Sequence, residues 1–253
     1  MTIHLGSLSG IILTYILVFA RTGAMVMLLP MISTIPAFIR LVLALAISVA
    51  LAPTVQHLYP QAAPASDLAL TLAIAQEVTA GVLIGGMSNI IMSSLQTAGM
   101  LIATQTGLAY AQTVDPTQHE QGAVIGNFLN LLGATLIFTT GLHHLAIGAV
   151  AGSYHLIPPG AALPTADMAE LVIRLVSGAF LLGFQLAAPF LVFGFALYAA
   201  LGVLARLMPQ MQVYFVGVPL SILAGFLIFA LVLVAMMGTF LNYFNGVMHD
   251  LTP

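Results

Sequence analysis

The sequence contains almost no charge. Only 4% of its 253 residues are charged, and these comprise four arginines, no lysine and seven Asp or Glu residues. A typical soluble domain carries about 25% charged residues, so this chain cannot build a surface that faces water. Lipid, partner subunits or both must therefore cover most of it. The net charge of −3 also leaves too few basic groups for a face that binds nucleic acid.

Cysteine is absent as well. This absence excludes disulfides, thiol catalysis and cysteine-ligated metal, and it leaves the redox compartment undetermined. A cleaved signal peptide is not expected, because the first ten residues lack a basic start and no cleavage pattern follows the first apolar run. We therefore expect that run to be retained.

Apolar side chains dominate what remains, with 61% hydrophobic residues and a mean hydropathy of +1.13. They gather in six blocks, at about residues 8–29, 38–55, 68–111, 121–151, 168–205 and 211–247. A bilayer core of about 30 Å needs about 20 helical residues, and backbone groups in lipid must bond within their own segment. The sequence thus predicts an all-α integral membrane protein. The longest blocks are expected to form tilted helices, kinked helices or tight hairpins.

Proline and aspartate suggest where these helices bend and begin. Pro53, Pro189 and Pro219 fall inside or at the ends of apolar blocks, where proline kinks a helix. Asp67 precedes the third block and is expected to cap it.

The two halves of the chain differ in style. Residues 1–165 hold four blocks with long connectors, whereas residues 166–253 hold two long apolar arms around the turn LARLMPQ. We interpret the chain, residues 1–253, as one subunit with a helical first part and a simple C-terminal hairpin. Membrane orientation stays open, because four scattered arginines give the positive-inside rule almost no bias.

The most polar stretch inside the apolar blocks is residues 96–116, QTAGMLIATQTGLAYAQTVDP. Gly99 and Gly107 allow backbones to approach closely, and the amides and threonines around them need partners or water. Pro116 disfavours helical geometry at Asp115, so the helix should end by about residue 114. Two interpretations remain open: a packed helix seam bonded by amides, or a helix end that faces a conduit.

Arg21 and Glu77 are the two charges deepest in the apolar blocks. Ionisable groups at membrane depth are functional candidates. The favoured interpretation is structural: either an ion pair that sets helix register, or an Arg21 side chain that extends from a helix end toward the membrane surface. Gly81 and Gly85, close to Glu77, provide a small-residue face for close helix packing.

Metal binding and catalysis find little support in the sequence. His143 and His144 are adjacent, so their side chains should diverge by about 100° on a helix, and no further ligand lies three or four residues away. No metal and no cofactor are expected. A membrane enzyme would need a cluster of catalytic groups, and the acidic residues here are scattered, so we predict no enzyme. A secondary transporter would need repeats and charged midplane sites, for which only Arg21 and Glu77 are available.

Three stretches resemble one protein family. They are TAGMLIATQTGLAYAQTVDP (97–116), GLHHLAIGAVAGSYHLIPPG (141–160) and LGVLARLMPQMQVYFVGVPLSILAG (201–225). In this order they are similar to the FliR family of flagellar export proteins and its injectisome relatives. The resemblance covers nearly the whole chain.

The resemblance implies a channel-forming subunit of the flagellar type III export gate in the bacterial inner membrane, within the flagellar basal body. Its implied partners are FliP and FliQ homologues, together with FlhA and FlhB homologues, unfolded export substrates and lipid. Residues 1–165 would be similar to a P subunit and residues 166–253 to a Q hairpin, assembled as bent hairpins in a shallow spiral. The equivalent injectisome subunit is the alternative.

The resemblance also implies roles for particular residues. A loop that plugs the conduit before secretion would comprise Gly107, Leu108, Tyr110, Thr113, Val114, Asp115 and Pro116. Tyr110 and Val114 are the expected bulk of the closed gate. The turn with Arg206, Pro209 and Gln210 would face the cytoplasmic entrance.

Overall fold

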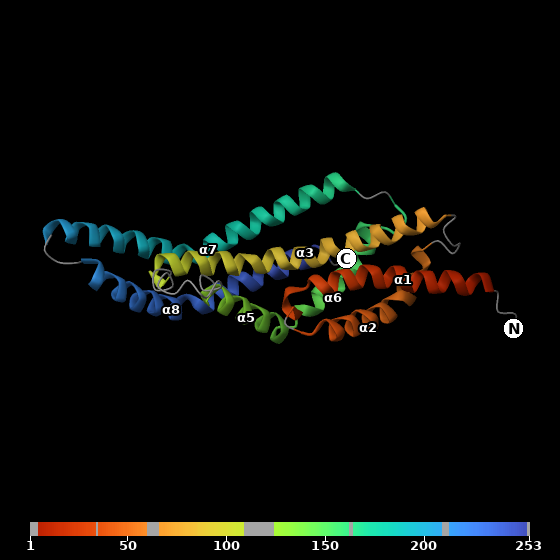
Figure 1. Ribbon diagram of the computed structural model, residues 1–253, viewed down its shortest axis with the longest axis horizontal. Coiled ribbons are helices and arrows are strands. Elements are labelled where there is room, and N and C mark those ends of the chain that lie inside the picture. Colours follow the sequence, from red (N-terminus) through yellow and green to blue (C-terminus); the bar gives the residue numbers. More distant parts are fainter. Residues whose placement is uncertain are drawn as a thin grey trace. The chain divides into compact units, whose positions relative to one another are not determined.

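The protein is described here from a computed structural model, which covers residues 5–33, 35–59, 66–108, 124–161, 164–208 and 213–251. Within these ranges the chain is helical and no residue lies in a β-strand (Figure 1). The helices are α1 (Leu5–Leu28), α2 (Ala37–Val55), α3 (Asp67–Gln105), α5 (Val124–Thr139), α6 (His143–Leu156), α7 (Thr165–Leu207) and α8 (Val213–His249). Short 3₁₀ turns follow α1 (η1, Pro30–Ile32) and α2 (η2, Gln56–Leu58). The predicted all-α class is therefore confirmed.

The apolar blocks become long helices. By length and composition, five helical segments of the described chain are suited to cross a membrane: Gly10–Leu28, Ala37–Leu58, Asp67–Gln105, Thr165–Leu207 and Gly217–His249. Most of the block at 68–111 lies in one uninterrupted helix, α3, which has 39 residues and at 1.5 Å per residue is about 58 Å long. Such a helix is nearly twice as long as the bilayer core is thick.

The fourth block is broken. Helices α5 and α6 meet at an angle of 76°, and Gly141 between them has a φ of +75°. Glycine adopts this left-handed conformation at little cost, so the sequence TTGL gives the chain a place to turn.

Helix α3 begins one residue away from its predicted cap. Ser66, not Asp67, accepts a hydrogen bond from the backbone N–H of Ala69 on its Oγ, at 3.2 Å. Asp67 is the first residue of the helix, where its negative charge faces the positive end of the helix dipole. Serine and aspartate are both good N-cap residues. The sequence alone therefore did not decide whether Ser66 or Asp67 caps α3.

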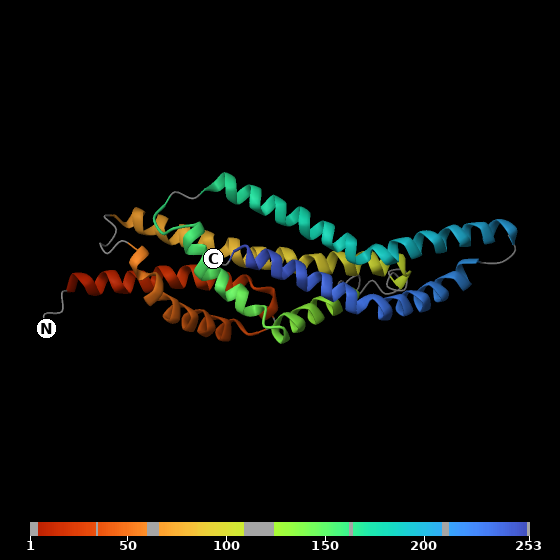
Figure 2. The ribbon, with the colours of Figure 1, turned by 180° about the vertical axis from the view of Figure 1, so that it is seen from behind.

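The chain divides into two compact units. Unit 1 comprises Met1–Ile90, Ile137–Leu175 and Phe244–Pro253. In it, α1 and α2 lie side by side, joined through η1, and α6 packs against both (Figures 1 and 2). Its fully or almost fully buried apolar side chains include Val18, Met25, Ala44, Ala80 and Val150.

Unit 2 comprises Ile91–Leu136 and Val176–Tyr243. Within it, α7 and α8 form an antiparallel hairpin: Gly178 faces the hydroxyl of Tyr243, and Gly217 faces Leu201. Its core includes Leu95, Ile102, Leu129, Phe190 and Phe240, which are fully buried. The C-terminal pair of long arms predicted from the sequence is present as these two helices.

Large apolar side chains also cover the outside of the described helices. Phe38 on α2 is 75% exposed, Phe195 on α7 is 79% exposed and Val234 on α8 is 83% exposed. Soluble monomers rarely expose large contiguous apolar surfaces. These helix faces therefore require lipid or another protein to cover them.

Candidate functional site

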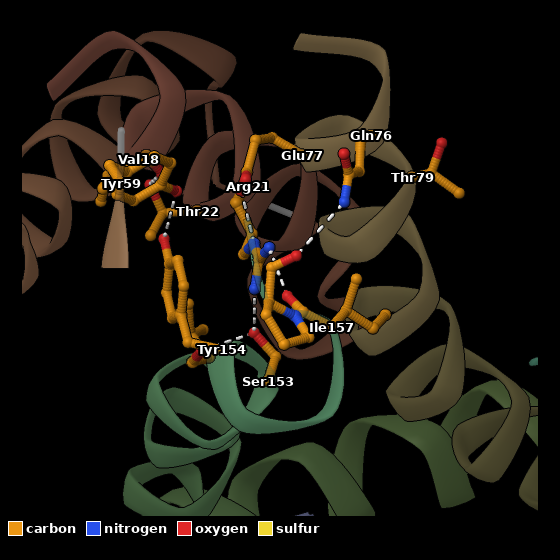
Figure 3. A network of polar contacts seen from close by, with 12 residues as sticks. Val18, Arg21, Thr22, Tyr59, Gln76, Glu77, Thr79, Ser153, Tyr154 and Ile157 are labelled. Carbon is orange, nitrogen blue, oxygen red and sulfur yellow. Dashed lines mark hydrogen bonds and ion pairs between the residues drawn. The ribbon is translucent and has the colours of Figure 1, made fainter. Parts of the chain in front are cut away.

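The most buried charge of the described chain is Arg21, whose side chain has no exposed surface. It lies on α1 and bonds through Nε to Oε2 of Glu77 on α3, at 2.6 Å (Figure 3). The two residues are 56 positions apart in the sequence, and Glu77 is itself 2% exposed. The structure thus brings together the two charges that the sequence analysis singled out.

The rest of the guanidinium is held by α6 and the residue that follows it. One terminal nitrogen donates to Oγ of Ser153 and the other to the carbonyl oxygen of Ile157, both at 3.0 Å. The ring of Tyr154 lies against the guanidinium, with 3.9 Å from Cζ to the ring centroid. A buried charge is costly unless it is paired and hydrogen-bonded. Arg21 is paired with Glu77 and also donates hydrogen bonds to Ser153 and Ile157.

Tyr59, just after η2, extends this cluster to the end of α2. Its hydroxyl lies 3.5 Å from the hydroxyl of Tyr154, and the two rings meet edge to face with centroids 6.1 Å apart. Burial raises the pKa of Tyr59 above its usual value, so the phenol stays neutral. Three helices, α1, α3 and α6, and the residues that directly follow η2 and α6 therefore converge on one polar centre. We call it the Arg21 centre, and it comprises Arg21, Tyr59, Glu77, Ser153, Tyr154 and Ile157.

A glycine seam lies next to the Arg21 centre. A Cβ added to Gly81 would collide with the carbonyl oxygen of Arg21, and one added to Gly85 would lie 2.7 Å from that of Met25. The backbones of α1 and α3 therefore touch, with Glu77, Gly81 and Gly85 on one face of α3, four residues apart. Gly86 has no atom within 4 Å of such a Cβ, so it has no part in the seam.

In unit 2, the polar residues of α3 lie against glycines of its neighbours. A Cβ on Gly99 would collide with the backbone of Gly126 on α5. Beside that contact, the amide of Asn130 donates to Oε1 of Gln96 at 2.8 Å. These groups carry no charge, in contrast to those of unit 1.

The same arrangement recurs with α7 and α8. A Cβ on Gly183 would lie 3.0 Å from Cβ of Thr97. Gly194 lies against Gln105 in the same way, and Gly225 lies against Thr106. In the described part of the stretch at 96–116, four polar side chains thus lie against glycines of neighbouring helices, as in a packed seam: Gln96, Thr97, Gln105 and Thr106. Thr104 is exposed and has no such contact with the glycines that the structure describes.

Helix α3 ends earlier than the proline alone required. Gly107 has a φ of +76° and donates its N–H to the carbonyl of Thr104 at 3.3 Å, so the helix ends at Gln105. Left-handed glycine is a common helix terminator, and the Thr106–Gly107 pair is the sequence signal for it. Leu108 follows and lines an apolar cavity of about 290 Å³ in unit 2, together with Val124 of α5.

Several residues assigned from the resemblance lie outside the described ranges. In the loop these are Tyr110, Thr113, Val114, Asp115 and Pro116, and in the hairpin turn they are Pro209 and Gln210. Arg206 is described: it is exposed in the last turn of α7, where a positive charge faces the negative end of the helix dipole.

The two adjacent histidines lie closer together than expected. The ring centroids of His143 and His144 are 4.0 Å apart, and Nδ1 of His144 lies 3.1 Å from the carbonyl oxygen of Gly141. The prediction that their side chains diverge is wrong, because the two rings lie in contact. Among the described residues, no group of three or more His, Asp or Glu side chains is arranged to hold a metal ion.

Sequence reasoning missed the neutral members of the Arg21 centre. Tyr59, Ser153 and Tyr154 carry no charge and lie far from Arg21 in the chain, so neither composition nor spacing indicated them. Gln76, the neighbour of Glu77, was also missed, although its amide donates to the carbonyl oxygens of Pro158 and Ala161.

Residues 12–247 match the sequence model of the family described as "Bacterial export proteins, family 1". The chain is 42% identical to the flagellar biosynthetic protein FliR of Caulobacter vibrioides over 217 residues, which cover 85% of this chain and 86% of that protein. It is 29% identical to FliR of Escherichia coli over 81% of this chain and 78% of that protein. It is also 27% identical to the Yop proteins translocation protein T of Yersinia pestis, over 60% and 59% respectively.

Proposed function

The chain belongs to the bacterial export proteins, family 1, and from this premise we propose that it is a structural, channel-forming subunit of the flagellar type III protein export gate. The observation that carries the proposal is the similarity, along most of the chain, to proteins named for flagellar biosynthesis. The long apolar helices and the sparse charge suit a structural role in a membrane assembly.

The flagellar system is preferred over the injectisome. The relatives that match more than four fifths of this chain carry the flagellar name, whereas the translocation protein of Yersinia pestis matches a smaller share. The equivalent injectisome subunit is the second candidate. Restored swimming, in a host that lacks its own flagellar homologue, supports the first; restored secretion only in an injectisome host supports the second.

The partners we propose are FliP and FliQ homologues in the bacterial inner membrane, within the flagellar basal body. The exposed apolar faces around Phe38, Phe195 and Val234 support a covered environment. Residues 1–165 would form a helical part similar to a P subunit, and residues 166–253 a hairpin similar to a Q subunit. FlhA and FlhB homologues would lie on the cytoplasmic side, which the turn near Arg206 would face.

The conduit is proposed to meet this chain at residues 107–116. Gly107 and Leu108 end the described part of this stretch, and Leu108 borders an apolar cavity in unit 2. Apolar bulk at Tyr110 and Val114 would block water and ions before secretion by excluding water from a narrow passage. Unfolded substrates would displace that bulk during export.

Co-purification tests the assembly. Tagged full-length chain, co-expressed with FliP and FliQ homologues and extracted in detergent, should run as one large particle containing all three. A lone monomer that is stable in the bilayer and supports export by itself would contradict the proposal.

Cysteine crosslinking tests the conduit assignment, and the natural absence of cysteine makes single-cysteine variants clean. We expect Tyr110→Cys and Val114→Cys to crosslink to a substrate stalled during export. Val234→Cys, on an exposed face of α8, is the matched control for Val114→Cys and should crosslink to a partner or to nothing. Substrate crosslinks from position 234 and none from 110 or 114, in actively secreting cells, would remove the assignment.

A further inference from the structure

The connection between α6 and α7 begins with a rigid turn. Pro158, Pro159, Gly160 and Ala161 form it: the N–H of Ala161 donates to the carbonyl oxygen of Pro158 at 3.2 Å, and Gly160 has a φ of +77°. A proline in the second position and a left-handed glycine in the third are the requirements of a type II turn. The sequence PPGA therefore suits a type II turn at this place.

One side chain of α3 holds both ends of that turn. The amide nitrogen of Gln76 donates to the carbonyl oxygen of Pro158 at 3.3 Å and to that of Ala161 at 2.7 Å. A side-chain amide has two N–H donors on one nitrogen, so the two carbonyls use the full donor capacity of Gln76. Figure 3 shows this amide reaching from α3 toward the connection.

The next residue of α3 acts on the same segment through Arg21. Glu77 bonds Arg21, and Arg21 donates to the carbonyl oxygen of Ile157, the residue just before the turn. Gln76 and Glu77, adjacent on one helix, therefore hold the carbonyls of residues 157, 158 and 161. Helix α7 starts at Thr165, only four residues after the second attachment of Gln76.

The two attachments differ in character. Arg21 and Glu77 are buried and charged, so their bonds hold as long as unit 1 is folded. Gln76 is neutral and only partly buried, and water can replace its two bonds without leaving a buried charge. The bonds of Gln76 are therefore the ones that can open while unit 1 stays folded.

We propose that Gln76 is a positioning residue that docks the Pro158–Ala161 turn on α3 and so sets where α7 begins, and that export requires this docking. The requirement for export rests on the proposed function, whereas the docking itself does not. Loss of two neutral hydrogen bonds shifts the equilibrium between docked and undocked turn by roughly tenfold or more.

Spin labelling in the full chain, co-expressed with its partners, tests the docking. The label is a nitroxide attached at Ala161→Cys, which is exposed and would be the only cysteine of the chain. Gln76→Glu keeps the shape of the side chain and replaces its donors by an acceptor, so we expect greater label mobility and reduced secretion of flagellar substrate. Gln185→Glu, at an exposed glutamine of α7, introduces the same charge and should change neither measurement.

Two further variants separate donor loss from added charge and from misfolding. In Gln76→Met the new side chain has a length similar to that of glutamine but carries neither a donor nor a charge. This variant should show the same increase in label mobility and the same reduction in secretion as Gln76→Glu. It also provides the test if Gln76→Glu does not accumulate in the cell. Gln76→Arg keeps N–H donors and should restore low mobility and most of the secretion.

The outcomes separate the two parts of the proposal. Unchanged mobility in both donor-lacking variants, or equal mobility gained with Gln185→Glu, overturns the docking. Increased mobility with undiminished secretion overturns the positioning role and leaves the proposed function intact. If the mobility results follow expectation but no chain, including the parent, supports secretion, the proposed function and the requirement for export fail while the docking stands.

Discussion

The two units place polar groups among apolar helices in different ways. Unit 1 has a buried charged centre, in which Arg21 bonds Glu77 and two groups at the end of α6. Unit 2 has neutral groups spread along α3, such as Gln96 and Thr106, set against glycines of other helices. The arrangement in unit 1 depends mainly on charge and on the direction of its hydrogen bonds. The arrangement in unit 2 depends mainly on how side chains fit against glycines.

This difference shows what defines the register of the packed helices in each unit. Gly81 and Gly85 are four residues apart and face carbonyls that are also four apart, those of Arg21 and Met25. A slip of one helical turn would therefore still place Gly85 against the carbonyl of Arg21, so the glycine seam alone does not define the register. The charge pair is present once, and a slip would break it. In unit 2, some glycines lie against threonine side chains and others against glutamine side chains. A slip would pair a glycine with a side chain of another size, so this variety distinguishes one register from another.

Removal of one member of the charge pair is the strongest way to test this comparison. Glu77→Ala should lower the free energy of unfolding by about 3–5 kcal/mol, because it leaves Arg21 buried without its counter-charge. The measurement is the midpoint of unfolding of the full chain in detergent, followed by circular dichroism. Glu170→Ala is the matched control: Glu170 pairs with Arg174 in the same helix, but both are exposed, so the midpoint should not move.

The double variant Arg21→Leu/Glu77→Leu sharpens this test. Replacing both partners by apolar side chains is often neutral for stability, so much of the loss should be recovered. Register specificity should suffer instead, and disulfide crosslinks between α1 and α3 should appear at positions one turn apart. Equal midpoints for Glu77→Ala and Glu170→Ala would show that the Arg21 centre does not hold unit 1 in the way described.

Filling the glycine seams should have an intermediate effect, equal in sign in both units. In Gly81→Ala and Gly99→Ala, the new methyl group meets backbone atoms of the neighbouring helix, which forces the helices apart at a cost of about 1–3 kcal/mol. In Gly86→Ala and Gly238→Ala, nothing lies within 4 Å of the added Cβ. These controls should be neutral or more stable by about 0.5–1 kcal/mol, since alanine favours the helix.

The same unfolding midpoint distinguishes the four glycine variants. If Gly81→Ala and Gly86→Ala behave alike, the backbone contact between α1 and α3 is not a determinant of stability. If the midpoints differ between Gly81→Ala and Gly86→Ala but not between Gly99→Ala and Gly238→Ala, the helices of unit 2 tolerate separation. Side-chain fit against glycines would then not define the packing of unit 2.

The sequence was sufficient for the helices and their class, because long apolar runs leave the backbone few alternatives. It left open whether the block at 68–111 was one helix or a hairpin, since glycines such as Gly85, Gly86 and Gly99 fit either. The structure resolves this in favour of one helix, because Gly81, Gly85 and Gly99 lie at contacts with neighbouring helices and not at turns. The earlier end of the helix follows from the left-handed Gly107.

The Arg21 centre was only partly accessible from the sequence. Two charges at membrane depth drew attention to Arg21 and Glu77, since each needs a partner. Ser153 and Tyr154 bear no such mark, and they lie 132 residues or more from Arg21 along the chain. Their position depends on how α6 packs against α1 and α2, which is a tertiary feature. Gln76 was missed for a similar reason, because its partners are backbone carbonyls, which no side-chain pattern reveals.

The smallest expected effect lies at the neutral pair of unit 2. Asn130→Ala removes the donor to Gln96, and the loss should be about 1 kcal/mol or less, because the pair is uncharged and only partly buried. Asn127→Ala is the matched control. Asn127 is exposed on the same helix, so its substitution should not change the unfolding midpoint. The contrast with Glu77→Ala arises from the group that each substitution leaves without its partner. An amide without its partner keeps a neutral dipole that water or a neighbouring group can satisfy, whereas a guanidinium without its carboxylate keeps a full charge. A loss at Asn130 as large as that at Glu77 would mean that unit 2 also depends on a directional polar bond, and the distinction between charge and shape would no longer separate the two units.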